Sequence, residues 1–181
     1  MKRMLACLML MSCVVFFCSC GGESSDASPV KNSPELSEPA ETLDVTQVCD
    51  ALDGYIGEAE ASLAAVTESL NKIEQYSGIA QDAVINDTMG IALDAKSAIR
   101  DIYDRSEDIE NQAECADGFA DYYDCFKDVL GSALIFSDKV KEFCKDPSQE
   151  MFDDCDHAFN VYLASKLNYV DAQNEYIQKN G

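Results

Sequence analysis

The amino-acid sequence predicts an all-α protein: an antiparallel up-down-up-down four-helix bundle that follows a signal peptide and a disordered tether. Two observations carry the fold prediction. Apolar residues recur at alternating steps of four and three, the spacing that places them on one face of a helix. No proline occurs between residues 40 and 146, so long helices are permitted. The predicted helices cover about residues 43–76, 79–112, 117–145 and 147–179.

The first two predicted helices are each defined by an apolar stripe. The first stripe runs from Val45 to Ile73 and is followed by Ser77-Gly78, a typical helix stop. The second runs from Ile85 to Ile109, and no strong breaker separates it from the third helix. The boundary near residues 111–118 is therefore the weakest of the three.

The last two predicted helices meet at the stretch CKDPSQ. The third stripe ends at Phe143, and the fourth begins at Phe152. Asp146 is the expected N-cap, with Pro147 in the first turn and Gln149 reaching back to the cap. Because all the connections are short, successive helices should be antiparallel neighbours.

The N-terminus has the organisation of an export signal. Lys2 and Arg3 precede a 15-residue apolar run, Met4–Cys18. A basic start, a short apolar core and a small-residue exit are typical of a secretory signal peptide. The run is shorter than the roughly 20 residues that a spanning helix needs. Residues 1–19 are therefore predicted to be a signal peptide.

The exit of this run resembles the lipobox of bacterial lipoproteins over residues 1–22. Phe17, Cys18 and Ser19 precede Cys20, although leucine and a small residue are usual where Phe17 and Cys18 stand. The resemblance implies that Cys20 is acylated, becomes the first mature residue and anchors the chain to the cell envelope. No Asp follows Cys20, which in such lipoproteins favours the outer membrane, facing the periplasm or the surface. The alternative is ordinary secretion with cleavage near Gly22.

Residues 20–42 form the predicted tether. They are rich in Gly, Ser, Glu and Pro, with Pro29, Pro34 and Pro39 evenly spaced. Such a segment is too polar to pack and is stiffened by its prolines. The folded domain is then expected within residues 43–181.

The charge of the exported chain limits its partners. Removing residues 1–19 takes away Lys2 and Arg3 and no acidic residue, which leaves 11 basic and 34 acidic residues and a net charge of −23. A polyanion repels nucleic acid and anionic lipid headgroups. The expected contacts are the membrane through the lipid anchor, and a basic envelope protein or cations.

Five cysteines fall within the predicted domain, and outside the cytoplasm such residues usually form disulfides. Cys144 and Cys155 straddle the last turn and are the preferred pair. Cys49 is expected to pair with Cys115 or Cys125, and the choice is open. No two of these cysteines have a zinc-ligand spacing.

One charged residue interrupts an apolar stripe. Lys166 falls near the centre of the fourth stripe, where a buried amine needs a counter-charge. Counting back through the turns places it level with Asp53. One hypothesis is a cavity for a small anionic or polar ligand, anchored by Lys166. The alternative is that Lys166 pairs with Asp53 and the tyrosine hydroxyls reach the surface. The candidate cavity residues are Lys166, Asp53, Tyr122, Tyr162, Tyr169 and Gln173.

Acidic residues line the outer faces of the two middle helices. They are either a docking face for a cationic partner or simply solvated surface. The third-helix set is Glu114, Asp117, Asp121, Asp124 and Asp128, and the second-helix set is Asp87, Asp94, Asp101 and Asp108.

No constellation indicates catalysis, a cofactor or a metal. The single histidine, His157, points away from its helix's apolar stripe and cannot supply the pair that a di-iron site requires. The sequence therefore predicts a lipid-anchored extracytoplasmic module that is not an enzyme and binds through its acidic outer faces. The alternative function is a small-ligand carrier or sensor that uses the Lys166 cavity.

Overall fold

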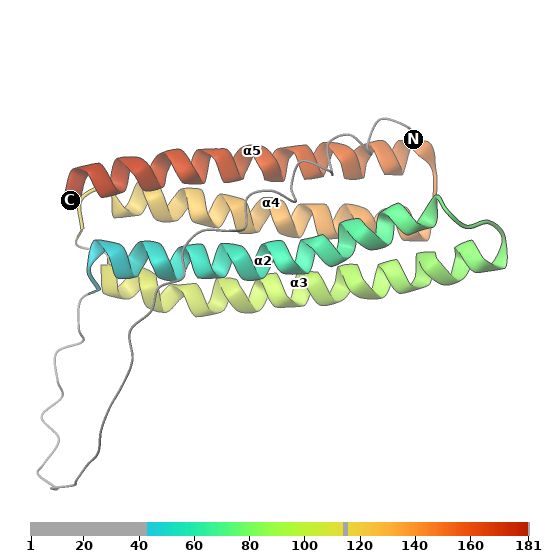
Figure 1. Cartoon of the computed structure of the whole chain (residues 1–181), viewed down its shortest axis with the longest axis horizontal. Helices are drawn as coiled ribbons and strands as arrows, with labels where there is room; N and C mark the ends of the chain where they lie inside the picture. Colours follow the sequence, from blue (N-terminus) through green and yellow to red (C-terminus); the bar gives the residue numbers. More distant parts are fainter. Residues whose placement is uncertain (1–42, 114–115, 181) are drawn as a thin grey trace, which may run out of the picture. The chain divides into compact units, whose positions relative to one another are not determined.

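The computed structural model describes residues 43–113 and 116–180. This part is all-helical: α2 (Val45–Ile73), α3 (Ile79–Ala113), α4 (Phe119–Lys145) and α5 (Gln149–Asn180). The helices pack as a four-helix bundle, each running back along the one before it (Figure 1). The prediction of an all-α four-helix bundle is confirmed. None of the described helices is apolar over a length that would cross a bilayer. The predicted signal peptide, Cys20 and the predicted tether lie outside the described residues.

The ends of α2 have clear local causes. Asp44 is the N-cap: its carboxylate accepts the Gln47 backbone N–H, and the Gln47 side chain accepts the Asp44 N–H, both at 2.9 Å. This reciprocal capping box satisfies two of the helix's free donors. After α2, Gly78 adopts a φ of 60°, a left-handed conformation that glycine takes without strain.

The two later connections refine the sequence-based boundaries. Gly118, with a φ of 76°, directly precedes α4 and supplies the breaker at that junction. The predicted N-cap of α5 is wrong by two residues. Asp146 instead closes α4, where its N–H donates to the Glu142 carbonyl at 3.2 Å. Ser148 caps α5 by accepting the Met151 N–H at 3.3 Å. Gln149 bonds forward to Asp153 at 2.7 Å and does not reach back to the cap.

The core changes character along the bundle. The half that holds the start of α2 and the end of α5 is rich in stacked aromatic rings, and the half beyond Phe136 is mostly aliphatic and phenylalanine. Tyr122, Tyr123, Tyr162 and Tyr176 are each at most 2% exposed. Burying rings of this size contributes strongly to stability, provided that their hydroxyls find partners or reach solvent.

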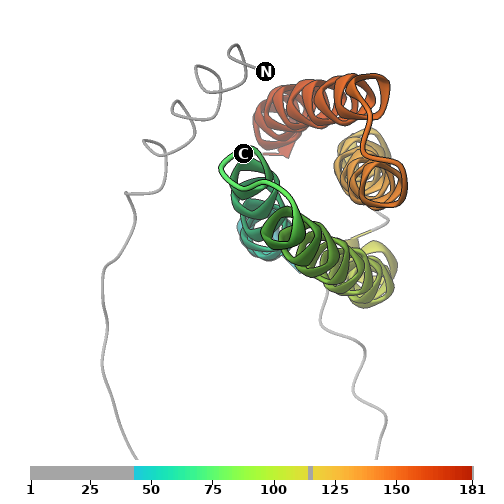
Figure 2. The ribbon, with the colours of Figure 1, turned by 90° about the vertical axis from the view of Figure 1, so that its right-hand side faces the viewer.

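The bundle is not square in cross-section. α2 packs closely along α3 and also contacts α4 across the bundle, but its backbone approaches that of α5 at only a few positions. Figure 2 shows α5 lying beside α4 and set apart from α2. Of the four sides of the bundle, the one between α2 and α5 is therefore the least closed.

Candidate functional site

A hydrogen-bonded cluster joins three helices in the aromatic half; we call it the Asp53 network. It consists of Asp53 on α2, Tyr122 on α4, and Tyr169 and Gln173 on α5. Tyr169 Oη donates to Asp53 Oδ1 at 2.7 Å, and Gln173 Nε2 lies 3.0 Å from both carboxylate oxygens. Tyr122 Oη lies 2.8 Å from Tyr169 Oη. Because Tyr169 gives its only proton to Asp53, Tyr122 must be the donor to Tyr169.

Aromatic stacking holds the two hydroxyls in place. The Tyr122 ring stacks on Tyr169 at 5.3 Å and on Tyr176 at 5.1 Å between centroids. Burial raises the pKa of Tyr122 and of Tyr169 far above the ordinary phenol value, so both stay protonated. The arrangement is a fixed chain of donors that ends on a carboxylate.

Cys49 lies against this network and is also buried. Burial is the main cause that raises its pKa, opposed by the polar Tyr122 hydroxyl beside it and reinforced by the charge of Asp53. A thiol held protonated in this way is a poor nucleophile. Cys49 therefore forms part of the wall of the site.

Lys166 does not pair with Asp53, and that prediction is wrong. Its ammonium instead forms an ion pair with Glu60 of α2. The Lys166 side chain is 26% exposed and the Glu60 side chain 32% exposed, so the pair is only partly buried. Asp53 is already occupied by Tyr169 and Gln173. The partner is displaced by seven residues, about 10 Å along a helix at 1.5 Å per residue. Tyr169, three residues further along α5, is the side chain that reaches Asp53, so counting through the turns found the right region of α2 but the wrong partner.

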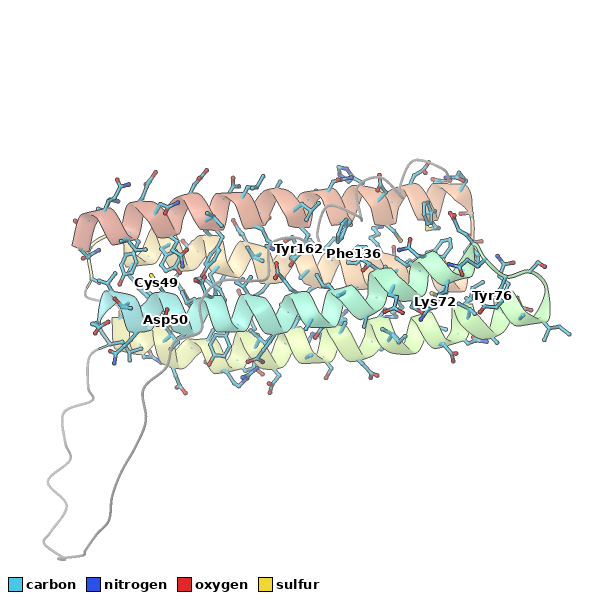
Figure 3. The ribbon with its side chains drawn as sticks, in the orientation of Figure 1. Cys49, Asp50, Lys72, Tyr76, Phe136 and Tyr162 are labelled. Carbon is cyan, nitrogen blue, oxygen red and sulfur yellow. The ribbon has the colours of Figure 1, made fainter. Side chains whose placement is uncertain are left out.

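Tyr162 stands apart from the Asp53 network. It is 1% exposed, and its hydroxyl has no hydrogen-bond partner among the described residues. Its ring lies 6.0 Å from that of Phe159, and Figure 3 shows it near Phe136 in the middle of the bundle. Burial alone raises its pKa. The predicted cavity residues thus divide into the Asp53 network, the Lys166–Glu60 pair and an isolated Tyr162.

A groove opens beside the Asp53 network, at the start of α2 and the end of α5; we call it the acidic groove. Its volume is about 500 Å³. Asp53 and Gln173 form one wall, and Figure 3 shows Cys49 and Asp50 close together in this region. Sequence reasoning missed Asp44, Asp50 and Ile177, which only the α2–α5 register brings together. The lining residues are Asp44, Val45, Thr46, Cys49, Asp50, Asp53, Gln173, Ile177 and Asn180.

The charge of this groove is opposite to the one expected for a Lys166 cavity. Three of its lining side chains are carboxylates and none is a lysine or arginine. Lys166 does not line it. A bound group of complementary charge would therefore be a cation.

Among the described residues, the predicted disulfides are not formed. Cys49, Cys125, Cys144 and Cys155 are all free thiols, so neither Cys144–Cys155 nor Cys49–Cys125 is bonded. Cys144 and Cys155 are both buried in the core, where a thiol packs as a small apolar side chain and needs no bond. Burial raises the pKa of Cys144 to about 11 and that of Cys155 to about 12. Cys115, the other proposed partner of Cys49, lies outside the described residues.

The acidic outer faces are where the sequence places them. Four of the predicted residues are exposed, and we call them the α4 acidic row: Asp117, Asp121, Asp124 and Asp128. Glu114 lies outside the described residues. Within it only Asp124 has an ion pair with a described residue, namely with Lys127 at 2.8 Å. The row on α3 is exposed as well: Asp87, Asp94, Asp101 and Asp108.

Nothing within the described residues gathers three or more histidine, cysteine or acidic side chains into a set that could hold a metal ion. Comparison of the chain with protein family models, with curated proteins and with solved structures found no match. Function must therefore be argued from the surfaces of the bundle itself.

Proposed function

We propose that this protein is a lipid-anchored binding module outside the cytoplasm, whose acidic outer faces contact a cationic partner such as a basic envelope protein. The observation that carries the proposal is the exposure of the α4 acidic row. Asp117, Asp121 and Asp128 have no ion pair with any described residue, so their charge is free to attract a partner. Complementary charge of this kind accelerates encounter and selects partners by sign.

Charge-neutral variants test the binding surface. Changing the α4 acidic row to asparagine should abolish recovery of a basic partner after cross-linking in the native host. The matched control changes four carboxylates elsewhere, so that the net charge is altered equally: Glu74→Gln, Asp82→Asn, Glu150→Gln and Asp171→Asn. Equal loss of partner in both variants would mean that only overall charge matters and would contradict a defined face.

The anchor is tested separately. Metabolic labelling with a fatty-acid probe should modify the wild-type protein and leave Cys20→Ser unlabelled. The Cys20→Ser protein should also leave the membrane fraction, because two or three acyl chains are needed for stable attachment. Wild-type protein that is secreted without label would contradict the anchor while leaving the acidic-face proposal intact.

A small-ligand carrier remains the second proposal, because the acidic groove is large enough for a small organic molecule. Its carboxylates favour a cation over the anion that Lys166 would have selected. Native mass spectrometry of the purified protein tests it. A co-purifying small cation that is lost in Asp50→Asn supports a carrier, and protein of unmodified mass contradicts it.

A further inference from the structure

The side of the bundle between α2 and α5 is held together by long side chains and not by close backbones. Tyr169 and Gln173 reach across to Asp53, and Lys166 reaches across to Glu60. The α2 backbone comes near that of α5 at few positions, in contrast to its packing along α3. We call this strip the α2–α5 seam.

The α2 border of the seam is made of small side chains. A side chain added at Gly57 would meet no other atom within 4 Å. Ala64, seven residues further on and therefore on the same helix face, is exposed. Gly57 lies between Asp53 and Glu60, two α2 residues whose side chains bond to α5. This border therefore offers room directly above the bridging side chains.

The α5 border is apolar and exposed. Val170 is 46% exposed and Ile177 is 44% exposed, again seven residues apart. Ile177 lines the acidic groove together with Gln173, the α5 residue that contacts Asp53. Two aliphatic side chains at helical spacing thus flank the seam on the side away from Gly57.

The seam ends in the acidic groove, which sets the charge of what it would accept. Asp44, Asp50 and Asp53 contribute carboxylates there, and no basic side chain lines it. Lys166, the basic residue on the seam, is already paired with Glu60. The surface therefore has apolar borders on both sides of its polar bridging residues and is negative at one end.

We propose that the α2–α5 seam docks a basic amphipathic helix of a partner protein. The apolar face of that helix packs over Gly57 and against Val170 and Ile177, and one of its lysine or arginine side chains enters the acidic groove beside Asp50. The seven-residue spacing of both borders matches the two-turn repeat of a helix, and a helix laid in a groove is a common mode of peptide recognition. The seam does not involve the α4 acidic row, so it goes beyond the function proposed above.

The test uses the full chain and a fluorescent 18-residue peptide of leucine and lysine, with the leucines on one helical face. Binding is followed by fluorescence anisotropy. Gly57→Lys places a bulky cation in the seam, and Gly90→Lys makes the same change on α3, where the glycine also has nothing within 4 Å. Gly57→Lys should weaken binding at least tenfold, whereas Gly90→Lys should stay within twofold of wild type. Circular dichroism checks that both variants fold.

Two further measurements locate the contact. Asp50→Asn should weaken binding severalfold and reduce its dependence on salt, because one carboxylate of the acidic groove is lost. Hydrogen exchange should slow in residues 45–64 and 163–177 when the peptide binds. A peptide of the same composition but without a leucine face should bind at least tenfold more weakly.

Several results would overturn the proposal. Equal affinities of Gly57→Lys and Gly90→Lys, or of the two peptides, would reduce the interaction to overall charge. Loss of peptide binding on neutralising the α4 acidic row alone would move the contact to that face. A concentration-dependent dimer in sedimentation that Gly57→Lys abolishes would make a second copy the occupant. Tenfold tighter peptide binding after deletion of residues 20–42 would assign the seam to the chain's own segment.

Discussion

Removing the Tyr169 hydroxyl is the sharpest perturbation of the Asp53 network. The substitution Tyr169→Phe keeps the stacked ring and deletes two hydrogen bonds, one to Asp53 at 2.7 Å and one from Tyr122 at 2.8 Å. Asp53 is exposed and keeps Gln173, so solvent offsets much of the first loss. The buried Tyr122 hydroxyl still accepts from Gln173 Nε2 at 3.2 Å but loses the acceptor for its own proton, and an unsatisfied buried donor costs about 1–3 kcal/mol.

The expected loss in unfolding free energy is therefore about 2–3 kcal/mol, measured by urea denaturation followed at 222 nm. Tyr176→Phe is the matched control. Its ring also stacks on Tyr122, at 5.1 Å, but the described contacts include no hydrogen bond from its hydroxyl. The control should lose less than about 0.5 kcal/mol. If the two variants were equally stable, the chain of donors from Tyr122 to Asp53 would have no energetic role.

Three other perturbations follow from the packing. In reducing buffer, Cys155 should lower the unfolding free energy by about 1 kcal/mol between pH 9 and 10, because burial keeps the native thiol protonated while the unfolded thiol ionises. Cys155→Ala should make this pH dependence less steep, and an unchanged slope would contradict burial as its cause. Lys166→Met should lower the unfolding free energy by about 1 kcal/mol, because it leaves Glu60 unpaired, and adding Glu60→Leu should restore the wild-type value. A double variant less stable than Lys166→Met alone would show that the ion pair itself stabilises the fold. Gly57→Ala should stabilise the protein by up to about 1 kcal/mol, since Gly57 is inside a helix and an added Cβ would meet nothing within 4 Å. Gly118→Ala should destabilise it, because the φ of Gly118 is 76°. Thermal melts that shift in the same direction for both variants would refute the backbone argument.

The helices themselves were predictable because their periodicity is local. The stripe from Val45 to Ile73 matches the bounds of α2, and Phe119 begins α4. The α5 cap was less predictable, since Asp146 and Ser148 both precede the helix and both can cap. Only the closing of α4 by Asp146 decides between them.

The partners across the bundle were not predictable in the same way. Asp53 and Tyr169 were placed in the same half, but the pattern could not show that Tyr169 and Gln173, and not Lys166, would reach Asp53. An error of seven residues leaves the facing direction unchanged, because seven residues are close to two full turns. A sequence pattern therefore identifies the face of a helix far better than its height.

The acidic groove lies where the start of α2 and the end of α5 meet, which affects where a tag can be placed. Asp44, just before α2, and Asn180, at the end of α5, both line it. An affinity tag appended after Gly181 would emerge within a residue of the groove and compete with whatever enters it. Tags intended to leave this pole accessible belong in the α2–α3 turn near Gly78, at the other end of the rods (Figure 1).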